Sequence, residues 1–251
     1  MNVLILAGER PEGDPLAHAE GVASKCDILI AGKTMLQHVM SALSGLTPTP
    51  VVFISSNQPV CAGVIRIPTA ATPCTSVLDA IRKTDFPVLI TTADHPLLTP
   101  DIMADFLTQA ALTTADVVVG VVELERVMTA YPQSRRTRLR FRDGSISGAN
   151  LFLLRNKNAE KLIDFWRQVE ANRKSPLRML RVLGVGTMLR FALGLLRFSE
   201  VVDIIEQRTD VHIATVRLSD PHAAIDVDKA EDLALVRHIF AARVIAAEKQ
   251  A

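Results

Sequence analysis

The chain has 251 residues, 49% of them hydrophobic, and its 28 Lys and Arg against 27 Asp and Glu leave a formal net charge of +1. This length fits one large domain, and the balanced charge gives no basic field of the kind that nucleic-acid-binding proteins use. The three cysteines match no zinc or redox spacing, which favours a reducing, cytoplasmic compartment. Residues 1–8 lack a basic leader and no apolar run reaches about 18 residues, so we expect neither a signal peptide nor a membrane span.

Strand and helix patterns alternate along the first half of the chain. Such alternation predicts right-handed crossovers, a mostly parallel sheet with helices on both faces, and ligand binding beyond the carboxyl ends of the strands. The spacing predicts that Thr75 or Ser76 caps the second helix and Thr99 the third. We expect strands at 2–7, 50–55, 64–67, 87–92 and 116–123, and helices at 34–43, 75–83 and 100–112.

The second half has a different pattern. Two strands at 138–142 and 147–155 are expected to be joined by a turn at Asp143-Gly144. A helix at 158–171, a strand at 211–218 and a long closing helix at 228–248 follow. We find no linker and no internal repeat, so the whole chain 1–251 is expected to form one domain.

A first group of candidate functional residues lies between Val3 and Val39. The first strand ends at Gly8, where a ligand can approach the backbone closely. Loop amides, Arg10 and Lys25 are suited to hold a triphosphate. An ordinary loop with surface cations explains the same residues, and the pattern alone leaves both interpretations open.

Three carboxylates form a second group. Asp94 directly follows the strand 87–92, and Asp226 and Asp228 share one face if their segment is extended. Carboxylate oxygens are the ligands that Mg²⁺ prefers. The alternatives are that Asp94 caps a turn before Pro96 and that Asp228 caps the last helix, with Glu231 completing a capping box.

These motifs resemble those of the nucleotidyltransferase superfamily that includes the molybdenum cofactor guanylyltransferases and the sugar-phosphate and methylerythritol-phosphate cytidylyltransferases. The segments that match the family pattern are Leu6-Ala7-Gly8, Arg10, Lys25, Gly32-Lys33-Thr34-Met35-Leu36, the run 91–98 and the run 224–233. The departures are a longer, more acidic loop between Gly8 and Lys25, with Asp14, His18 and Glu20, and Lys229-Ala230 where the family has Thr-Pro.

The resemblance implies a Rossmann-like α/β fold of the GT-A type with a small helical and β-ribbon subdomain on the acceptor side. It implies a nucleotide-binding half at 1–123, an acceptor-side or lid region at 124–220, and a metal-binding motif with the closing helix at 221–251. It also implies site roles: Leu6, Ala7, Gly8, Lys25, Ser76 and Asp94 for the nucleotide, Lys25 and Arg10 for the leaving pyrophosphate, Asp94, Asp226 and Asp228 for Mg²⁺, and Asn150 for the acceptor.

The expected reaction is transfer of an NMP group from Mg²⁺-bound CTP or GTP to a phosphorylated small molecule, with release of pyrophosphate. Two alternatives keep the same fold: a GT-A glycosyltransferase that uses nucleotide sugars, and a non-catalytic nucleotide-binding protein. A dinucleotide-dependent dehydrogenase is disfavoured because no G-x-G-x-x-G follows the first strand.

Basic residues concentrate in two places of the second half. Arg138, Arg140 and Arg142 alternate, so they would share a strand face that suits an anionic acceptor, or would protect a solvated edge strand. Residues 171–199 contain no acidic side chain, and basic and apolar residues are mixed through 173–198. That segment could contact an anionic membrane surface, cover the acceptor site or form a homodimer contact.

Overall fold

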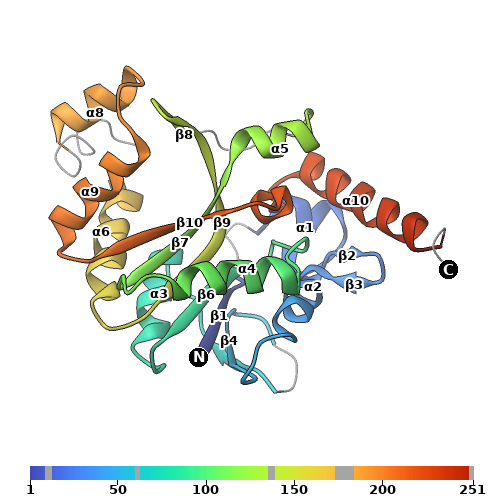
Figure 1. Cartoon of the computed structure of the whole chain (residues 1–251). Coiled ribbons are helices and arrows are strands. Elements are labelled where there is room, and N and C mark those ends of the chain that lie inside the picture. The colour runs from blue at the N-terminus through green and yellow to red at the C-terminus, as the bar shows by residue number, and fades with distance from the viewer. Residues whose placement is uncertain (9–12, 60–62, 135–138, 173–183, 249–251) are drawn as a thin grey trace.

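The computed structural model describes residues 1–8, 13–59, 63–134, 139–172 and 184–248. Within these ranges one sheet has the order β10-β7-β9-β6-β1-β4-β5, with β8 paired to β9 (Figure 1). β9 runs antiparallel to its neighbours, whereas the pairs β1–β4, β1–β6, β4–β5 and β7–β10 are parallel. The strands are β1 Asn2–Leu6, β4 Val51–Ser55, β5 Ile65–Ile67, β6 Val88–Thr92, β7 Val117–Glu123, β8 Leu139–Phe141, β9 Gly144–Leu154 and β10 Ile213–Leu218.

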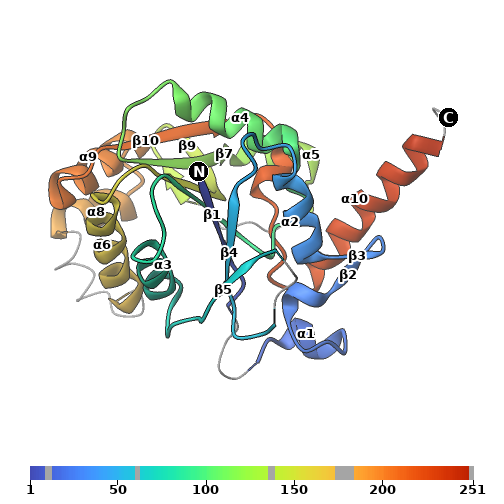
Figure 2. The same cartoon turned by 90° about the horizontal axis from the view of Figure 1, so that it is seen from below.

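Helices cover both faces of this sheet, which confirms the predicted fold class (Figure 2). Side chains alternate along a strand, so neighbouring residues of β1 enter different cores. Val3 and Ile5 pack with α2 Met35–Leu43 and α4 Pro100–Ala111. Leu4 packs with α3 Pro73–Ile81 and α6 Ala159–Asn172 on the opposite face.

Further elements, short and long, surround this framework. Five-residue α1 and the 3₁₀ turn η2 were not predicted, because they are too short to show a helical period. The longer helices α5, α8 and α9 were not predicted either. The local signal of α1 and η2 is an Asp before a Pro: Asp14 accepts from the Leu16 N–H and Asp220 from the His222 N–H. The remaining elements are α1 Pro15–Ala19, η1 Lys25–Asp27, β2 Leu29–Ile30, β3 Lys33–Thr34, α5 Leu124–Ala130, α8 Val185–Ala192, α9 Phe198–Thr209, η2 Pro221–Ala224 and α10 Ala230–Glu248.

Helix caps agree with the sequence at α4 and correct it at α3. Thr99 caps α4 by accepting from the Ile102 N–H at 3.3 Å. The expected caps of α3, Thr75 and Ser76, are wrong, because the helix begins earlier, with Pro73 in its first turn and Thr72 as its cap. Proline has no N–H to leave unsatisfied in the first turn, so its position marks the helix start better than the hydroxyls do.

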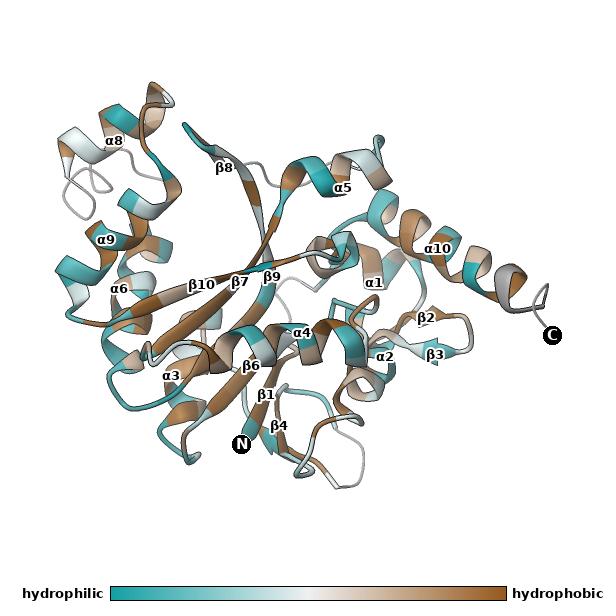
Figure 3. Cartoon of the chain, in the orientation of Figure 1, coloured by the Kyte–Doolittle hydropathy of each residue, from teal (hydrophilic) through white to brown (hydrophobic). Residues whose placement is uncertain are grey.

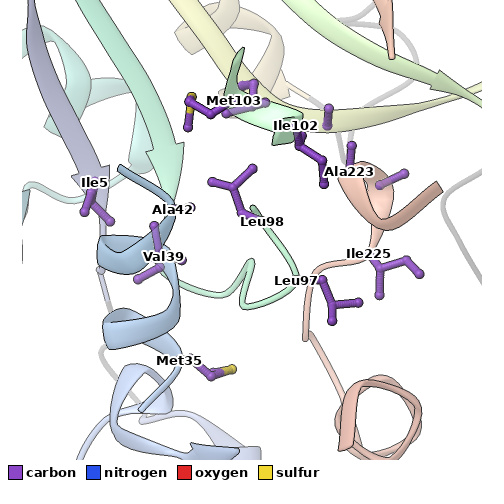
Figure 4. Close-up of a cluster of buried hydrophobic side chains, with 14 of the residues drawn as sticks. Ile5, Met35, Val39, Ala42, Leu97, Leu98, Ile102, Met103, Ala223 and Ile225 are labelled. Carbon is purple, nitrogen blue, oxygen red and sulfur yellow. The ribbon is translucent and has the colours of Figure 1, made fainter. Parts of the chain in front are cut away.

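An apolar cluster lies beneath the carboxyl ends of β1 and β6 (Figure 4). Leu97 and Leu98, in the segment after β6, pack among Met35 and Val39 of α2, Ile102 of α4 and Ile225 after η2. Leu97 and Ile225 are fully buried. This packing fixes the two segments from which Asp94 and Asp226 emerge. Among the helices of the described ranges, none has the length and apolar character needed to cross a bilayer.

The cap of α4 gives a test of how firmly the segment after β6 is held. Thr99→Ala removes the side-chain acceptor of the Ile102 N–H, so we expect a loss of about 1 kcal/mol in the free energy of unfolding. Urea unfolding followed by circular dichroism measures it. Thr108→Ala, at an exposed position within the same helix, is the matched control and should be neutral or slightly stabilising. Equal losses for the two variants would contradict the assigned cap.

Candidate active site

The carboxyl ends of β1 and β6 form the floor of the site. Leu6 is paired with Ser55 of β4 on one side and with Thr92 of β6 on the other. The ladder continues as the Ala7 N–H donates to the Ser55 carbonyl at 3.0 Å and the Ala93 N–H to the Leu6 carbonyl at 2.9 Å. In the sheet, β4 lies on one side of β1 and β6 lies on the other, so the strand order reverses direction at β1. The carboxyl end of β1 is therefore the topological switch point where such sheets bind ligands.

Gly8 follows this floor and lies in a narrow place. A Cβ at position 8 would lie 3.3 Å from the Thr69 methyl group, in the segment between β5 and α3. Ser76 supports the same segment from within α3, because its buried hydroxyl accepts from the Ala70 N–H at 2.9 Å. The segment of Thr69 and Ala70 therefore lies against both residues. It comes close to Gly8 because Gly8 has no side chain, and it is hydrogen-bonded to Ser76.

Lys25 is placed over the floor by the short turn η1. The Ser24 hydroxyl accepts from the Cys26 N–H, and Cys26 and Ile28 are buried below α2. The Lys25 Nζ atom lies 2.8 Å from Asp94 Oδ2 and 3.4 Å from Asp228 Oδ1. Lys25 thus links the end of β6 to the segment before α10.

The charge of Lys25 is well stabilised in this position. Burial alone would lower the pKa of Lys25, but the charge and hydrogen bond of Asp94, with smaller contributions from Asp228 and Asp14, raise that pKa above the usual 10.5. Lys25 is therefore protonated at neutral pH. The second oxygen of Asp94, Oδ1, is buried and has no hydrogen-bond partner in the part of the chain that the structure describes.

The segment 226–228 contributes its two carboxylates in different directions. Its backbone is tied to the end of β6, since the Val227 N–H donates to the Asp94 carbonyl at 2.9 Å. The Asp226 Oδ2 atom accepts from the Asn150 amide at 3.1 Å, whereas Asp228 faces Lys25 and its side chain is 65% exposed. The Asp228 N–H donates to the Asp232 carboxylate, so Asp232 and not Glu231 bonds the backbone here.

A β-bulge aims Asn150 at Asp226. Opposite Gly120 of β7, the register of β9 shifts, with Val119 facing Phe152 and Val121 facing Gly148. Gly120 makes room for the extra residues: a Cβ there would lie 3.2 Å from the Leu151 Cβ and 3.3 Å from the Ala149 Cβ. Asn150 has a φ of +50°, a conformation that asparagine tolerates better than most residues.

The predicted arginines and the acidic residues of the long loop are not part of this hydrogen-bonded arrangement in the described structure. Arg140 lies in β8, opposite Ser145, and its side chain is outside the described part. Arg10 lies outside the described residues altogether. The acidic residues of the long loop have structural roles, as Asp14 caps α1 and Glu20 forms an ion pair with Arg237 of α10. Within the described ranges no group of three or more His, Cys, Asp or Glu side chains is arranged to hold a metal ion.

A hydrogen-bonded chain that the sequence analysis missed holds the segment before Asp226. The Tyr131 hydroxyl lies 2.7 Å from His222 Nε2, and His222 Nδ1 lies 2.7 Å from the Asp220 carboxylate. His95, next to Asp94, donates from Nε2 to the His222 carbonyl at 3.1 Å. Hydrogen bonding to His222, although opposed by burial, lowers the pKa of Asp220 below its usual 3.8. Tyr131 and His222 lie 91 residues apart, so no local pattern could indicate the pair.

The described cysteines add no nucleophile. Cys26 and Cys74 are both free thiols, and burial raises the pKa of each to about 12. A thiol with such a pKa is almost wholly protonated at neutral pH, so neither residue is suited to nucleophilic attack.

The sheet with one reversed strand beside β6, the glycine after β1 and the aspartate after β6 define an α/β nucleotidyltransferase fold. Comparison with family models gave a match to the MobA-like NTP transferase domain over residues 3–161, which is more than half of the chain. The chain belongs to this family and is a nucleotidyltransferase. A comparison with curated proteins gave no match.

Solved structures agree with this assignment of the fold. A hypothetical transferase from Thermus thermophilus shares 29% identity with a TM-score of 0.80, covering 93% of this chain and 100% of its own. A CMP-2-keto-3-deoxy-manno-octonic acid synthetase complexed with CTP has a TM-score of 0.61 at 15% identity, with 96% and 98% covered. The 2-C-methyl-D-erythritol 4-phosphate cytidylyltransferase from Thermus thermophilus has a TM-score of 0.53 at 14% identity, with 95% and 98% covered.

The hydrogen-bonded chain through His222 predicts an acid-dependent part of the stability. Because the pKa of Asp220 is lowered in the folded protein, its contribution is present above the unfolded value of 3.8 and is lost as the pH falls through the folded value. Asp220→Asn should therefore cost about 1 kcal/mol at pH 7, a small figure because the group is partly exposed.

Urea unfolding of both proteins over a series of pH values measures this difference. The gap between the wild type and Asp220→Asn should narrow below pH 3.8. Tyr131→Phe removes a hydroxyl from the same chain but leaves Asp220 in place, so it should keep the acid dependence of the wild type. A gap that stays constant down to the acid limit would contradict the role given to Asp220.

Proposed function

We propose that this enzyme transfers an NMP group from Mg²⁺-bound CTP or GTP to a phosphorylated small-molecule acceptor and releases pyrophosphate. The observation that carries the proposal is the position of the Lys25 ammonium between Asp94 and Asp228, above the carboxyl ends of β1 and β6. This edge is where open α/β sheets bind nucleotides. The family supports an NTP as the donor, and the CTP complex of one structural neighbour supports CTP as a candidate.

The nucleotide would lie against Leu6, Ala7 and Gly8, with Ser76 supporting the neighbouring segment. Gly8 has no side chain to keep a phosphate or a base away from its backbone, and among the described residues the Thr69 side chain is what lies within 4 Å of its missing Cβ. Lys25, and Arg10 in the adjoining loop, would stabilise the negative charge that develops on the leaving pyrophosphate. In-line attack by the acceptor phosphate needs no protein nucleophile, so catalysis would consist of positioning and charge neutralisation.

Asp94, with Asp226 or Asp228, is the proposed set of Mg²⁺ ligands. The donor chemistry fits, because carboxylate oxygens suit this cation and Asp94 Oδ1 is a buried oxygen without a partner in the described residues. When bound, Mg²⁺ would neutralise phosphate charge. In the structure Lys25 supplies the positive charge between Asp94 and Asp228, so we propose that Lys25 turns from these carboxylates to the triphosphate when Mg²⁺-NTP binds.

The acceptor is proposed to bind beside Asn150 and the β8–β9 hairpin, within the region 124–220. The bulge in β9 holds the Asn150 amide next to Asp226, so an acceptor phosphate bound by Asn150 would lie close to the proposed metal ligands. Arg140 is suited to the charge of such an acceptor. The free thiols of Cys26 and Cys74 agree with a reaction in the cytoplasm.

A thermal-shift screen of the four NTPs with Mg²⁺ tests the choice of nucleotide. At about 100 times its Kd, the correct NTP should stabilise the protein by about 2.7 kcal/mol, or roughly 5–10 °C in Tm for a chain of this size. Pyrophosphate release would then be screened with phosphorylated sugars, alcohols and cofactor precursors. Pyrophosphate release with no preference among the four NTPs would contradict the choice of CTP or GTP. Turnover of a nucleotide sugar without pyrophosphate release would favour the glycosyltransferase alternative and overturn the proposal.

Substitutions at Asp94 and Lys25 test the site itself. Asp94→Asn and Lys25→Ala should each lower kcat by about 10²–10³, because each removes a charge that faces the reacting phosphates. Asp85→Asn, at the opposite end of β6, and Lys83→Ala, an exposed lysine after α3, are matched controls with wild-type rates. Full activity of Asp94→Asn or Lys25→Ala in the pyrophosphate assay would show that the site is misassigned.

The position of Lys25 predicts competition with divalent cations in the absence of nucleotide. Lys25→Met removes the ammonium group that lies against Asp94 and Asp228, so the freed carboxylates should bind Mn²⁺ about tenfold more tightly or better. Electron paramagnetic resonance of free Mn²⁺ measures this affinity without any turnover. Lys33→Met, at an exposed position in β3, is the control, and adding Asp94→Asn to Lys25→Met should abolish the gain. Equal affinity of the wild type and Lys25→Met would rule out this competition.

A further inference from the structure

α8 and the turn after it present apolar side chains to solvent. Val185, Leu189, Leu193 and Leu195 are 66%, 58%, 61% and 51% exposed, and Phe191 is 38% exposed. No residue of this helix is buried in the described structure. We call these five residues the α8 surface. Exposure of large apolar residues this close together marks a contact site for a partner.

The α8 surface is held in place from behind. Phe141 of β8 contacts Phe191 and Phe198, with ring centroids 5.9 and 5.3 Å apart. The Arg142 N–H donates to the Leu196 carbonyl at 2.9 Å, and the Phe198 N–H donates to Asp143 at 3.0 Å. The β8–β9 hairpin therefore supports α8 at one end of the molecule, away from the C-terminal end of α10 (Figures 1 and 2).

The charge of this region points to an anionic partner. Arg190 and Arg197 lie within residues 184–199, which hold no acidic side chain, and the sequence keeps this acid-free character over all of 171–199. The ion pair of Arg190 with Glu200, at 2.6 Å, anchors one of these cations to α9 at the edge of the surface. Figure 3 shows apolar and polar residues side by side on α8. Exposed apolar side chains beside cations, with the acid Glu200 paired to Arg190 at the edge, match the pattern of a helix that lies in the headgroup region of a membrane.

A second copy of the chain fits this surface less well. Most homodimers are twofold symmetric, so the same patch would meet itself. A twofold contact at α8 would bring residues 184–199, which carry Arg190 and Arg197 and no acidic side chain, against the same residues of the copy and oppose like charges. A bilayer of anionic lipid accepts the leucines in its acyl boundary and the arginines at its phosphates.

We propose that the α8 surface binds anionic phospholipid membranes and holds the enzyme at the bilayer surface without crossing it. Leu189, Leu193 and Leu195 enter the headgroup–acyl boundary, while Arg190 and Arg197 lie at the level of the phosphates. This inference does not depend on the nucleotide proposed above, because it uses no residue of the Lys25–Asp94 site.

Sedimentation of the full chain with vesicles tests the proposal. The wild type should bind vesicles of phosphatidylcholine mixed with phosphatidylglycerol with at least about tenfold higher affinity than vesicles of pure phosphatidylcholine. Added salt should weaken this binding. Leu189→Ser with Leu193→Ser should reduce binding about tenfold, because two apolar side chains no longer enter the bilayer. Leu112→Ser, at the 85% exposed leucine that ends α4, is the matched control and should bind like the wild type.

The double variant changes only exposed residues, and an unchanged Tm would show that it is folded. Equal binding to both kinds of vesicle, no binding at all, or undiminished binding of the folded double variant would each overturn the proposal. Analytical ultracentrifugation tests the alternative partner, a second copy of the chain. If the wild type does not bind vesicles but forms a dimer, and the double variant Leu189→Ser with Leu193→Ser is a monomer, the α8 surface is a site of self-association.

Discussion

The ion pair between Lys25 and Asp94 is the contact on which the arrangement of the site depends. Asp94 and Asp228 come from segments 134 residues apart, and two carboxylates brought to one place repel each other unless a cation lies with them. The Lys25 ammonium supplies that cation, and these anions keep its pKa high enough for it to stay charged at neutral pH despite its burial. The protein alone can thus keep an anionic site assembled before any substrate arrives.

The surrounding structure limits how far these charges can move. Leu97 and Ile225 are buried in one apolar cluster, so the chain is fixed on either side of the carboxylates. The Asp94 carbonyl accepts from the Val227 N–H, and His95 bonds the carbonyl of His222. Backbone contacts therefore hold the two acidic segments together, while the side chain of Asp228, largely exposed, stays free to turn. This fixed backbone would let the proposed turn of Lys25 toward a triphosphate take place without displacing the two acidic segments.

Much of the framework could be predicted from the sequence, because strands and long helices have a hydrophobic period. The sequence singles out both Lys25 and Asp94 by their places in family-like motifs, and the structure brings them together, while their roles in catalysis stay a prediction. What the sequence could not reveal depends on distant pairing: the partner of Asn150 is Asp226, and the partner of Tyr131 is His222. The wrong cap at Ser76 has a different cause, as several hydroxyls follow one another there and only Pro73 marks the helix start.

The bulge opposite Gly120 divides β9 into two stretches with separate registers. Phe152 to Leu154 are fixed between β6 and β7 in the middle of the sheet, whereas Gly144 to Gly148 pair with β8 and the end of β7. In an unbroken strand, inserting one residue would turn every later side chain to the other face. The bulge confines such a change to the hairpin side. A change in the length of the hairpin would therefore leave the pairing of Phe152 to Leu154 with β6 and β7 as it is.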